Sequence, residues 1–257
     1  MVLGLNNTLD YVAGRAGLRR WNRHADEADA MSAGELRVLR GQARAIRRQI
    51  DRFLFVAEGR LARPAIGNAV MPRPVGTDWA WRPEVWRGPL PVRGQAAVAS
   101  KTEIGAGATI FHDCSTSELT VRQIRNTREA DLAPFGLRMD VFRFDGSFLS
   151  LVLDLPDEAA HGLRLRHLVR LDTVIEMEKP LEIFARLNIK HGPNVEQVVR
   201  EIPPGQTEAS VEFDLAYTRV NEKRIEKLWI DLIFEGPELN QIVLRDVTCS
   251  RRPRAEL

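Results

Sequence analysis

Apolar and polar residues alternate with a period of two over most of the chain after about residue 109. Such alternation places successive side chains on opposite faces of a strand, so that one face can enter a core. It is clearest in residues 163–171, 181–190 and 211–217, and it recurs in residues 119–124, 137–144, 147–155, 195–202, 227–235 and 241–250. These about nine or ten strands, with no helix-period segment between them, predict a mainly β fold, an antiparallel β-sandwich or jelly roll.

Turn-forming residues separate several of these runs. Phe144-Asp145-Gly146-Ser147 lies between two apolar segments and predicts a β-hairpin, because Asp-Gly favours the tight turns that join paired strands. Residues 203–205 (PPG) and 236–237 (GP) mark further turns.

The first 63 residues have a different pattern and predict an α-helical extension. Ser32 and Glu35 form the spacing of a capping box, followed by apolar residues at heptad spacing up to about residue 58. Gly59 is expected to cap this helix, and a shorter helix over about residues 7–21 is expected to complete a hairpin. The heptad positions are occupied by Leu36, Leu39, Ala43, Ile46, Ile50, Phe53 and Ala57.

This heptad stripe has two interpretations. Residues 1–63 carry 12 arginines against 7 acidic residues, and the arginines at 37, 40, 44, 47, 48 and 52 all lie outside the stripe. In the first interpretation the stripe packs within its own domain and the arginines are solvated. In the second it docks on another subunit or on an acidic partner, with five candidate interface residues: Leu36, Leu39, Ile46, Ile50 and Phe53.

Residues 64–107 form a proline-rich segment between the predicted helices and the predicted sandwich of residues 108–257. Six prolines between residues 64 and 91 oppose both helix and central strand, which predicts a strap across a surface. Trp79, Trp81 and Trp86 lie in this strap. They either anchor it to the rest of the chain or offer indole faces to a sugar ring, beside residues able to bond sugar hydroxyls (Asp78, Arg82 and Glu84).

Composition and motifs argue against several classes of function. The net charge of +2 opposes a dedicated nucleic-acid binder. No apolar run approaches the roughly 20 residues of a membrane span, and the N-terminus lacks a signal-peptide layout. With only Cys114 and Cys249, no disulfide framework is expected, which fits synthesis in the cytoplasm. We expect no enzyme, no metal and no cofactor, because the motifs of a P-loop, a zinc protease and a serine hydrolase are missing.

Two sets of residues could in principle form a metal site or a catalytic site. His112, Asp113 and Cys114 are potential ligands, but adjacent strand residues point to opposite faces, and an ordinary buried thiol is the expected role of the cysteine. A glycoside hydrolase, which needs two carboxylates about 5–10 Å apart, is the less favoured alternative. Its candidate acids lie on or beside predicted strands: Glu176, Glu178, Glu182, Asp231 and Glu235.

Four segments resemble a protein family of Rhodobacter-type alphaproteobacteria, over about residues 20–257. They are residues 76–89 (GTDWAWRPEVWRGP), 124–150 (IRNTREADLAPFGLRMDVFRFDGSFLS), 176–188 (EMEKPLEIFARLN) and 244–255 (LRDVTCSRRPRA). The resemblance implies a link to gene transfer agents, the phage-like particles of these bacteria, and a structural role as the head-spike base on capsid vertices. It implies as partners a capsid protein and a spike or fibre protein, with assembly in the cytoplasm and release in the particle.

The leading hypothesis is therefore a non-enzymatic structural protein that forms a homo-oligomer. A pentamer is favoured, because a capsid vertex imposes fivefold symmetry. The alternative is a carbohydrate-binding β-sandwich that recognises cell-surface polysaccharide through Trp79, Trp81 and Trp86.

Overall fold

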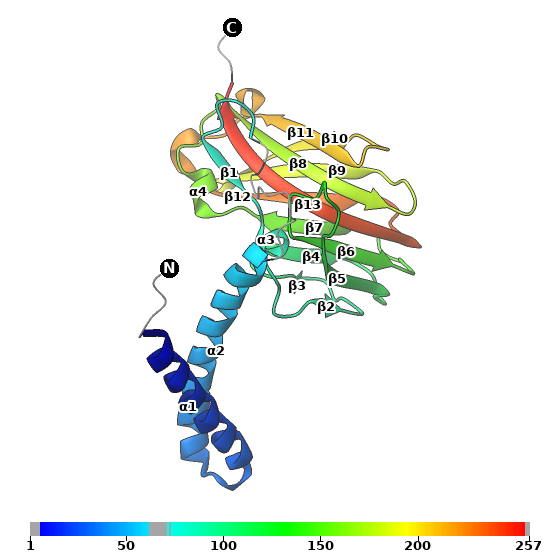
Figure 1. Ribbon diagram of the computed structural model, residues 1–257. Helices are drawn as coiled ribbons and strands as arrows, with labels where there is room; N and C mark the ends of the chain where they lie inside the picture. The colour runs from blue at the N-terminus through cyan, green and yellow to red at the C-terminus, as the bar shows by residue number, and fades with distance from the viewer. Residues whose placement is uncertain (1–5, 62–70, 72, 255–257) are drawn as a thin grey trace. The chain divides into compact units, whose positions relative to one another are not determined.

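The computed structural model describes residues 6–61, 71 and 73–254 (Figure 1). The chain forms two compact units, Met1–Phe53 and Leu54–Leu257, whose boundary falls inside one long helix. The predicted boundaries after residues 63 and 107 do not coincide with this division. The start of the predicted strap, residues 64–70 and 72, lies outside the described residues.

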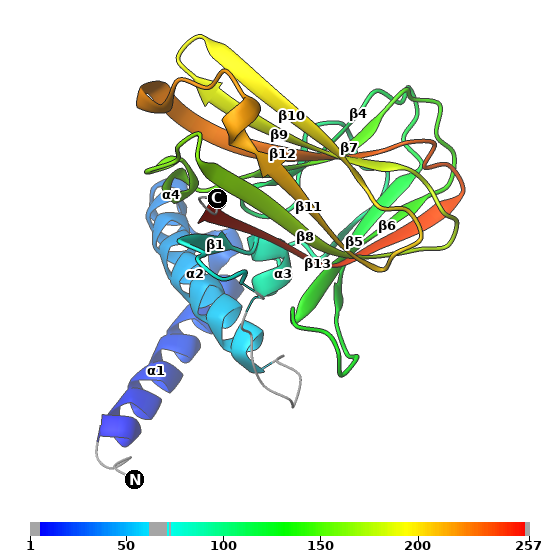
Figure 2. The ribbon, with the colours of Figure 1, turned by 90° about the horizontal axis from the view of Figure 1, so that it is seen from above.

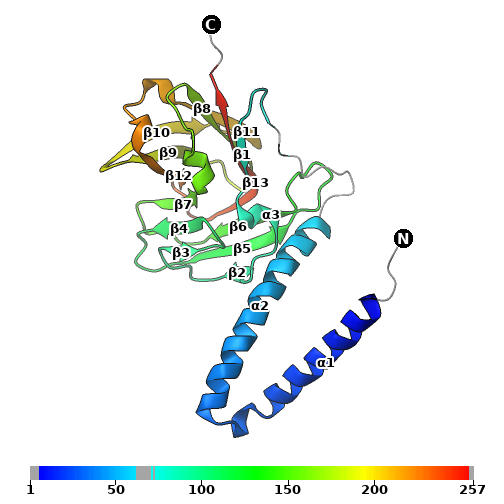
Figure 3. The same cartoon turned by 90° about the vertical axis from the view of Figure 1, so that its left-hand side faces the viewer.

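The N-terminal unit consists of helices, as the heptad pattern predicts. Helix α1 (Asn6–Asp26) is followed by a 3-10 turn, η1 (Ala28–Ala30), and by α2 (Ala33–Leu61), as Figure 3 shows. The capping box at the start of α2 is confirmed. The Ser32 N–H donates to Glu35 Oε2 at 3.1 Å, and the Glu35 N–H donates to Ser32 Oγ at 3.3 Å. The hydrogen bonds from Ser32 lower the pKa of Glu35.

Gly59 does not cap α2, since the helix continues to Leu61. A Cβ atom at Gly59 would lie 2.5 Å from the carbonyl oxygen of Arg87, so the glycine permits close approach of two backbone segments.

None of the helices in the described residues combines the length and the apolar character that a membrane span requires.

The C-terminal unit is a sandwich of two antiparallel sheets, seen as separate layers in Figure 2. Within the described residues, sheet A has seven strands and sheet B has six. Sheet A runs in the order β11 (Glu208–Asp214), β8 (His167–Met177), β13 (Asn240–Pro253), β6 (Phe135–Val141), β5 (Leu119–Arg125) and β2 (Gly94–Gln95), with β1 (Trp79–Trp81) paired to β13. Sheet B runs β10 (Asn194–Ile202), β9 (Ile183–His191), β12 (Ile225–Phe234), β7 (Leu149–Asp154), β4 (Ala108–His112) and β3 (Thr102–Glu103).

The inner faces of the two sheets form the core. In β12, Leu228, Ile230, Leu232 and Phe234 are buried, as the period of two requires. A bulge in β13 between Leu244 and Asp246 shifts the alternation by one residue, after which Val247 and Cys249 point inward. Complete burial raises the pKa of the Cys249 thiol, so this cysteine is an inert core residue. The predicted mainly β fold with an N-terminal helical extension is confirmed.

The predicted hairpin at residues 144–147 is wrong. The strands before and after it belong to different sheets, because β6 pairs with β5 and β13 whereas β7 pairs with β4 and β12. Side chains hold the connection: the Ser147 N–H donates to Asp113 Oδ1 at 2.7 Å, and the Ser115 N–H donates to Asp145 Oδ1 at 3.1 Å. The Asp-Gly pair therefore lies in a connection that crosses from β6 of sheet A to β7 of sheet B.

The described part of the proline-rich strap belongs to the sandwich. It contributes strand β1, a one-turn helix α3 (Glu84–Arg87), and the short strands β2 and β3. Arg82 makes two hydrogen bonds to Asp246, from Nε at 2.8 Å and from Nη2 at 2.7 Å, and both residues are buried. Gln123 accepts from the Leu90 N–H and thereby fixes the segment after α3. The other short helices are α4 (Asp157–Ala160), η2 (Leu215–Tyr217) and η3 (Glu222–Arg224).

Candidate functional site

The outer face of sheet B brings aromatic and hydrogen-bonding side chains together. Since Ile230 and Leu232 point into the core, their neighbours Trp229 and Asp231 point outward. Strand register sets Trp229 opposite Asn188 and Asp231 opposite Arg186. The face is therefore built from positions that alternate with the core across several strands.

A shallow hollow of about 520 Å³ lies on this face. Side chains from five strands and from the residue before β7 line it, so it depends on the assembled sheet. The lining residues are Phe111, Phe148, Ser150, Val152, Arg186, Asn188, Gln197, Trp229, Asp231 and Ile233. Phe148 is 41% exposed and Trp229 is half-buried, so both rings remain accessible to a ligand.

A hydrogen-bond network fixes the polar groups of the hollow. Asp231 Oδ2 accepts from Arg186 Nε at 2.7 Å and from Asn188 Nδ2 at 3.0 Å. Gln197 Nε2 donates to Asn188 Oδ1 at 2.8 Å, which extends the network to β10. Because the carboxylate of Asp231 is almost fully buried and paired, it orients the guanidinium and amide groups before any ligand arrives.

Ser150 provides an unused hydrogen-bonding group in the same hollow. Its residue is 6% exposed, and its Oγ atom is buried with no hydrogen-bond partner among the described residues. Strand register places Ser150 between Ile233 of β12 and Phe111 of β4 on the outer face. An unpaired buried hydroxyl is unfavourable, so it favours a ligand that supplies a donor or acceptor there.

The charges on this sheet face occur in pairs. Lys227 Nζ lies 2.7 Å from Asp154 Oδ1 and 6.0 Å from the centre of the Trp229 ring. Lys190 Nζ lies 2.8 Å from Glu226 Oε2, and this hydrogen bond is the main reason that the pKa of Glu226 is lowered. Together with the ion pair inside the hollow, these pairs give Arg186, Lys190 and Lys227 a carboxylate partner each.

The tryptophans predicted as sugar ligands lie away from this hollow. Trp86 is completely buried, and its indole N–H donates to the carbonyl oxygen of Leu244 at 2.9 Å. A ring with no exposed face cannot stack on a sugar, so for Trp86 the first of the two interpretations holds, and it anchors the strap. Trp79 and Trp81 are half-buried and pack against the core.

Two of the three polar residues named beside them, Arg82 and Asp78, are engaged in the fold. Arg82 is buried against Asp246, as described above. Asp78 accepts from Arg251 Nε at 2.9 Å and lies 3.4 Å from His167 Nε2. The strap thus provides structural contacts where the sequence left a binding role open.

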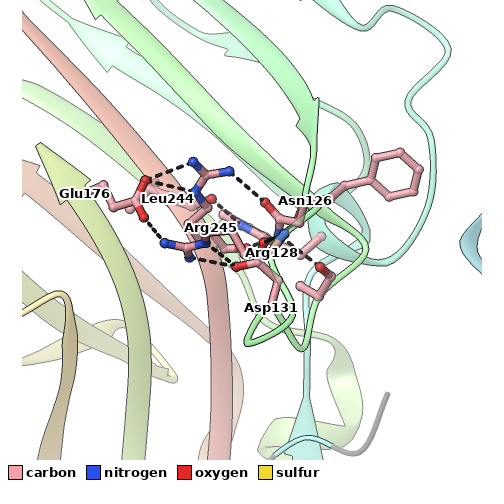
Figure 4. A network of polar contacts seen from close by, with 9 residues as sticks. Asn126, Arg128, Asp131, Glu176, Leu244 and Arg245 are labelled. Atoms are coloured by element: carbon pink, nitrogen blue, oxygen red, sulfur yellow. Dashed lines mark hydrogen bonds and ion pairs between the residues drawn. The ribbon is translucent and has the colours of Figure 1, made fainter. Parts of the chain in front are cut away.

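Two of the acids predicted for a hydrolase lie on different sheets, whereas Glu182 and Glu235 are neighbours, with the Glu235 N–H donating to the carbonyl oxygen of Glu182 at 3.0 Å. Asp231 lies on the outer face of sheet B, whereas Glu176 lies on the outer face of sheet A, because Ile175 beside it enters the core. Glu176 accepts from Arg245 Nη2 at 2.9 Å and pairs with Arg128, which also binds Asp131 (Figure 4). These two carboxylates therefore cannot flank one glycosidic bond.

Sheet A has its own outer hollow, of about 450 Å³, next to this network. None of the described residues that line it is aromatic, and several of its charged groups are paired, as Arg128 is with Asp131. Arg170 donates to Asp172 at 2.8 Å, and Ser210 Oγ donates to the same carboxylate at 2.6 Å. Sheet A thus lacks an apolar ring for a ligand at this position.

A family model matches residues 1–257, which is the whole chain. The chain belongs to DUF6478, a family of unknown function. No curated protein matches this DUF6478 chain.

Solved structures resemble the DUF6478 sandwich at low sequence identity. A family 11 carbohydrate-binding module from Clostridium thermocellum is 14% identical, with a TM-score of 0.39 over 65% of this chain and 99% of that chain. The CBM22-1 xylan-binding domain of Paenibacillus barcinonensis Xyn10C is 9% identical, with a TM-score of 0.36 over 61% and 92%. Tailspike protein 4 of bacteriophage CBA120 is 9% identical, with a TM-score of 0.40 over 56% of this chain and about a fifth (19%) of that chain.

Proposed function

We propose that this protein is a carbohydrate-binding β-sandwich that holds a neutral polysaccharide on the outer face of sheet B. The observation that carries the proposal is the hollow of about 520 Å³, where Trp229 and Phe148 lie with the fixed polar groups of Arg186 and Gln197. A sugar ring has an apolar C–H face and an edge of hydroxyl groups, and both parts find complementary chemistry there.

The pairing of charges supports a neutral ligand. An acidic polysaccharide would need unpaired cations, but Arg186, Lys190 and Lys227 each have a carboxylate partner on this face. The exposed amide of Gln197 and the hydroxyl of Ser150 suit sugar hydroxyls, which both donate and accept. The buried amide of Asn188 binds Gln197 and Asp231 and so orients the groups around the ligand. Cell-surface polysaccharide is the proposed source of this ligand.

The proposed role is binding without catalysis. Glycoside hydrolysis needs an acid and a second carboxylate about 5–10 Å apart. Asp231, the acid of the hollow, is committed to Arg186 and Asn188 through one oxygen. We assign it the task of orienting these two side chains.

The test is affinity electrophoresis of the full chain in gels that contain one polysaccharide each. The panel includes neutral polymers (mixed-linked β-glucan, xylan and dextran) and an acidic polymer (alginate). We expect retardation by a neutral polymer, and we expect Trp229→Ala to weaken it by at least about thirtyfold, as for loss of a buried aromatic anchor of about 2 kcal/mol.

A matched pair of phenylalanines controls for general effects. Phe148 in the hollow is 41% exposed, and Phe142, after strand β6 of sheet A, is 55% exposed. Phe148→Ala should weaken retardation, whereas Phe142→Ala should leave it unchanged. Retardation by no polymer, or equal effects of the two substitutions, would count against the proposal.

We propose an assembly role in a phage-like particle, as a head-spike base, as the second candidate. The observation that favours it is the exposed apolar stripe of α2, with Ile50 52% and Phe53 69% exposed. Incorporation into particles should fall in an Ile50→Glu chain that still binds polysaccharide. Normal incorporation of this variant would reject α2 as the attachment element.

A further inference from the structure

Helix α2 exposes one continuous apolar stripe. Its heptad positions a and d, counted from Leu36 as a, include Ile46 at 39%, Ile50 at 52% and Phe53 at 69% exposure, with Leu36 at 39%. Apolar side chains in a repeating stripe of this kind are stable when another helix covers them. Among the residues that the structure describes, the stripe therefore has exposed apolar side chains that no other helix covers.

The opposite face of the same helix is occupied at its C-terminal end. The Phe55 ring packs so closely on Gly88 that a Cβ there would lie 2.6 Å from it. Gly59 approaches the Arg87 carbonyl, and Glu58 Oε2 lies 2.9 Å from Arg93 Nη2. These residues occupy positions b, c and f, so these contacts leave Phe53, Leu54 and Val56 exposed at positions d, e and g. Leu61, at the last e position, borders a hollow that Ile124 and Phe135 also line.

The residues beside the stripe specify the partner. In a parallel pair of identical helices, each g position faces the e position five residues later on the other helix. For α2 this places Glu35 against Arg40, an attractive pair, and Gln42 against Arg47, a pair without repulsion. In the second half, Gln49 would face Leu54, and Val56 would face Leu61.

The same positions disfavour an antiparallel pair. There e faces e, which sets Arg40 and Arg47 against each other or against the apolar Leu54 and Leu61. The remaining arginines of the stripe region, at 37, 44, 48 and 52, occupy b, c and f and point away from either interface. Charge complementarity therefore selects the parallel arrangement of identical chains.

We infer that α2 is the interface of a parallel helical bundle formed by copies of this chain. Leu54, Val56 and Leu61 widen the apolar stripe into e and g, with exposed fractions of 40%, 53% and 81%, which favours more than two helices. A parallel bundle brings the C-terminal ends of all α2 helices together, so every sandwich follows from the same end. This inference is independent of glycan binding, but it gives such an oligomer several binding faces for one polymer.

The first experiment measures the mass of the full chain by sedimentation equilibrium over a wide concentration range. We expect an oligomer, and we expect Ile50→Glu to raise its dissociation constant by at least about tenfold. Val38→Glu is the matched control: Val38 is 60% exposed on the same helix but occupies position c. Circular dichroism verifies that both variants keep the helix.

A second experiment distinguishes the directions of the helices. Leu36→Cys, in a Cys114→Ser background, places one thiol at the start of the stripe. In a parallel bundle two such thiols meet, and mild oxidation gives a disulfide-linked dimer. In an antiparallel pair they are about 30 Å apart, at 1.5 Å per residue along the helix.

Each outcome decides the inference. A monomeric full chain at all concentrations would overturn it, as would equal dissociation by Val38→Glu and Ile50→Glu. An oligomer that resists Ile50→Glu would place the interface elsewhere. An oligomer without the disulfide-linked dimer would overturn the parallel arrangement, while an oligomer that forms only after an acidic protein is added would assign the stripe to that partner.

Discussion

The two outer faces of the sandwich have hollows of similar size, about 520 Å³ on sheet B and 450 Å³ on sheet A, yet they differ in what they leave unused. On sheet A, carboxylates and arginines bind one another, as Glu176 and Arg245 do. On sheet B, aromatic rings lie open and the hydroxyl of Ser150 has no partner among the described residues. A hollow is a candidate binding site where accessible aromatic rings or unpaired hydrogen-bonding groups remain for a ligand. Its size alone does not make it one.

The largest expected effect tests the structural role of the charges at sheet A. Arg82→Ala leaves the buried Asp246 without its bidentate partner, so the free energy of unfolding should fall by about 3–5 kcal/mol. Arg138→Ala is the control, because Arg138 pairs with Asp140 on the same face but is partly exposed, and its loss should cost about 0–1 kcal/mol. Urea denaturation measures both, and similar losses would show that the Asp246 pair contributes no more than a surface pair.

The sequence predicted the β-sandwich well, because the alternation of apolar and polar residues along a strand indicates directly which side chains face the core. It also predicted α2, from the heptad spacing of its apolar residues, and the capping box, from Ser32 and Glu35, which are only three positions apart. The hairpin at residues 144–147 failed, since the local Asp-Gly signal does not reveal that β6 and β7 join different partners in different sheets.

The candidate site was harder to find from the sequence. It depends on the register of strands that are far apart in the chain, such as β4 with Phe111 and β12 with Trp229. One signal was available: in the run from Lys227 to Glu235, Trp229 occupies an outward position of the alternation, where a polar residue is expected. The three tryptophans of the strap are close together in the sequence and were therefore more conspicuous. In the structure they pack against the core of the sandwich and anchor the strap to it.

A smaller effect should separate function from stability on sheet B. Ser150→Ala removes a buried hydroxyl that has no partner in the described residues, so the free energy of unfolding should stay the same or rise by about 1 kcal/mol. Polysaccharide retardation should nevertheless weaken by about threefold to tenfold, equivalent to one lost hydrogen bond. Thermal melting and affinity electrophoresis measure the two quantities on the same protein.

The opposite result for Ser150 is equally informative. A clear loss of stability in Ser150→Ala would mean that its hydroxyl already has a structural partner, such as a bound water. Thr173→Val is the control on sheet A, because Thr173 is also buried but donates to the carbonyl oxygen of Ala209 at 3.3 Å. It should lower stability by about 1 kcal/mol and leave retardation unchanged.

The smallest expected effect concerns salt. A ligand without charge on a face whose cations are paired should bind with nearly the same affinity at low and high ionic strength, within about twofold between 0.05 and 0.5 M NaCl. Two of the ion pairs, Lys190 with Glu226 and Lys227 with Asp154, are exposed and will weaken in salt, but they need not contact the sugar. Isothermal titration at the two salt concentrations provides the comparison. A tenfold loss of affinity in high salt would instead indicate an acidic polymer and would contradict the proposal of a neutral ligand.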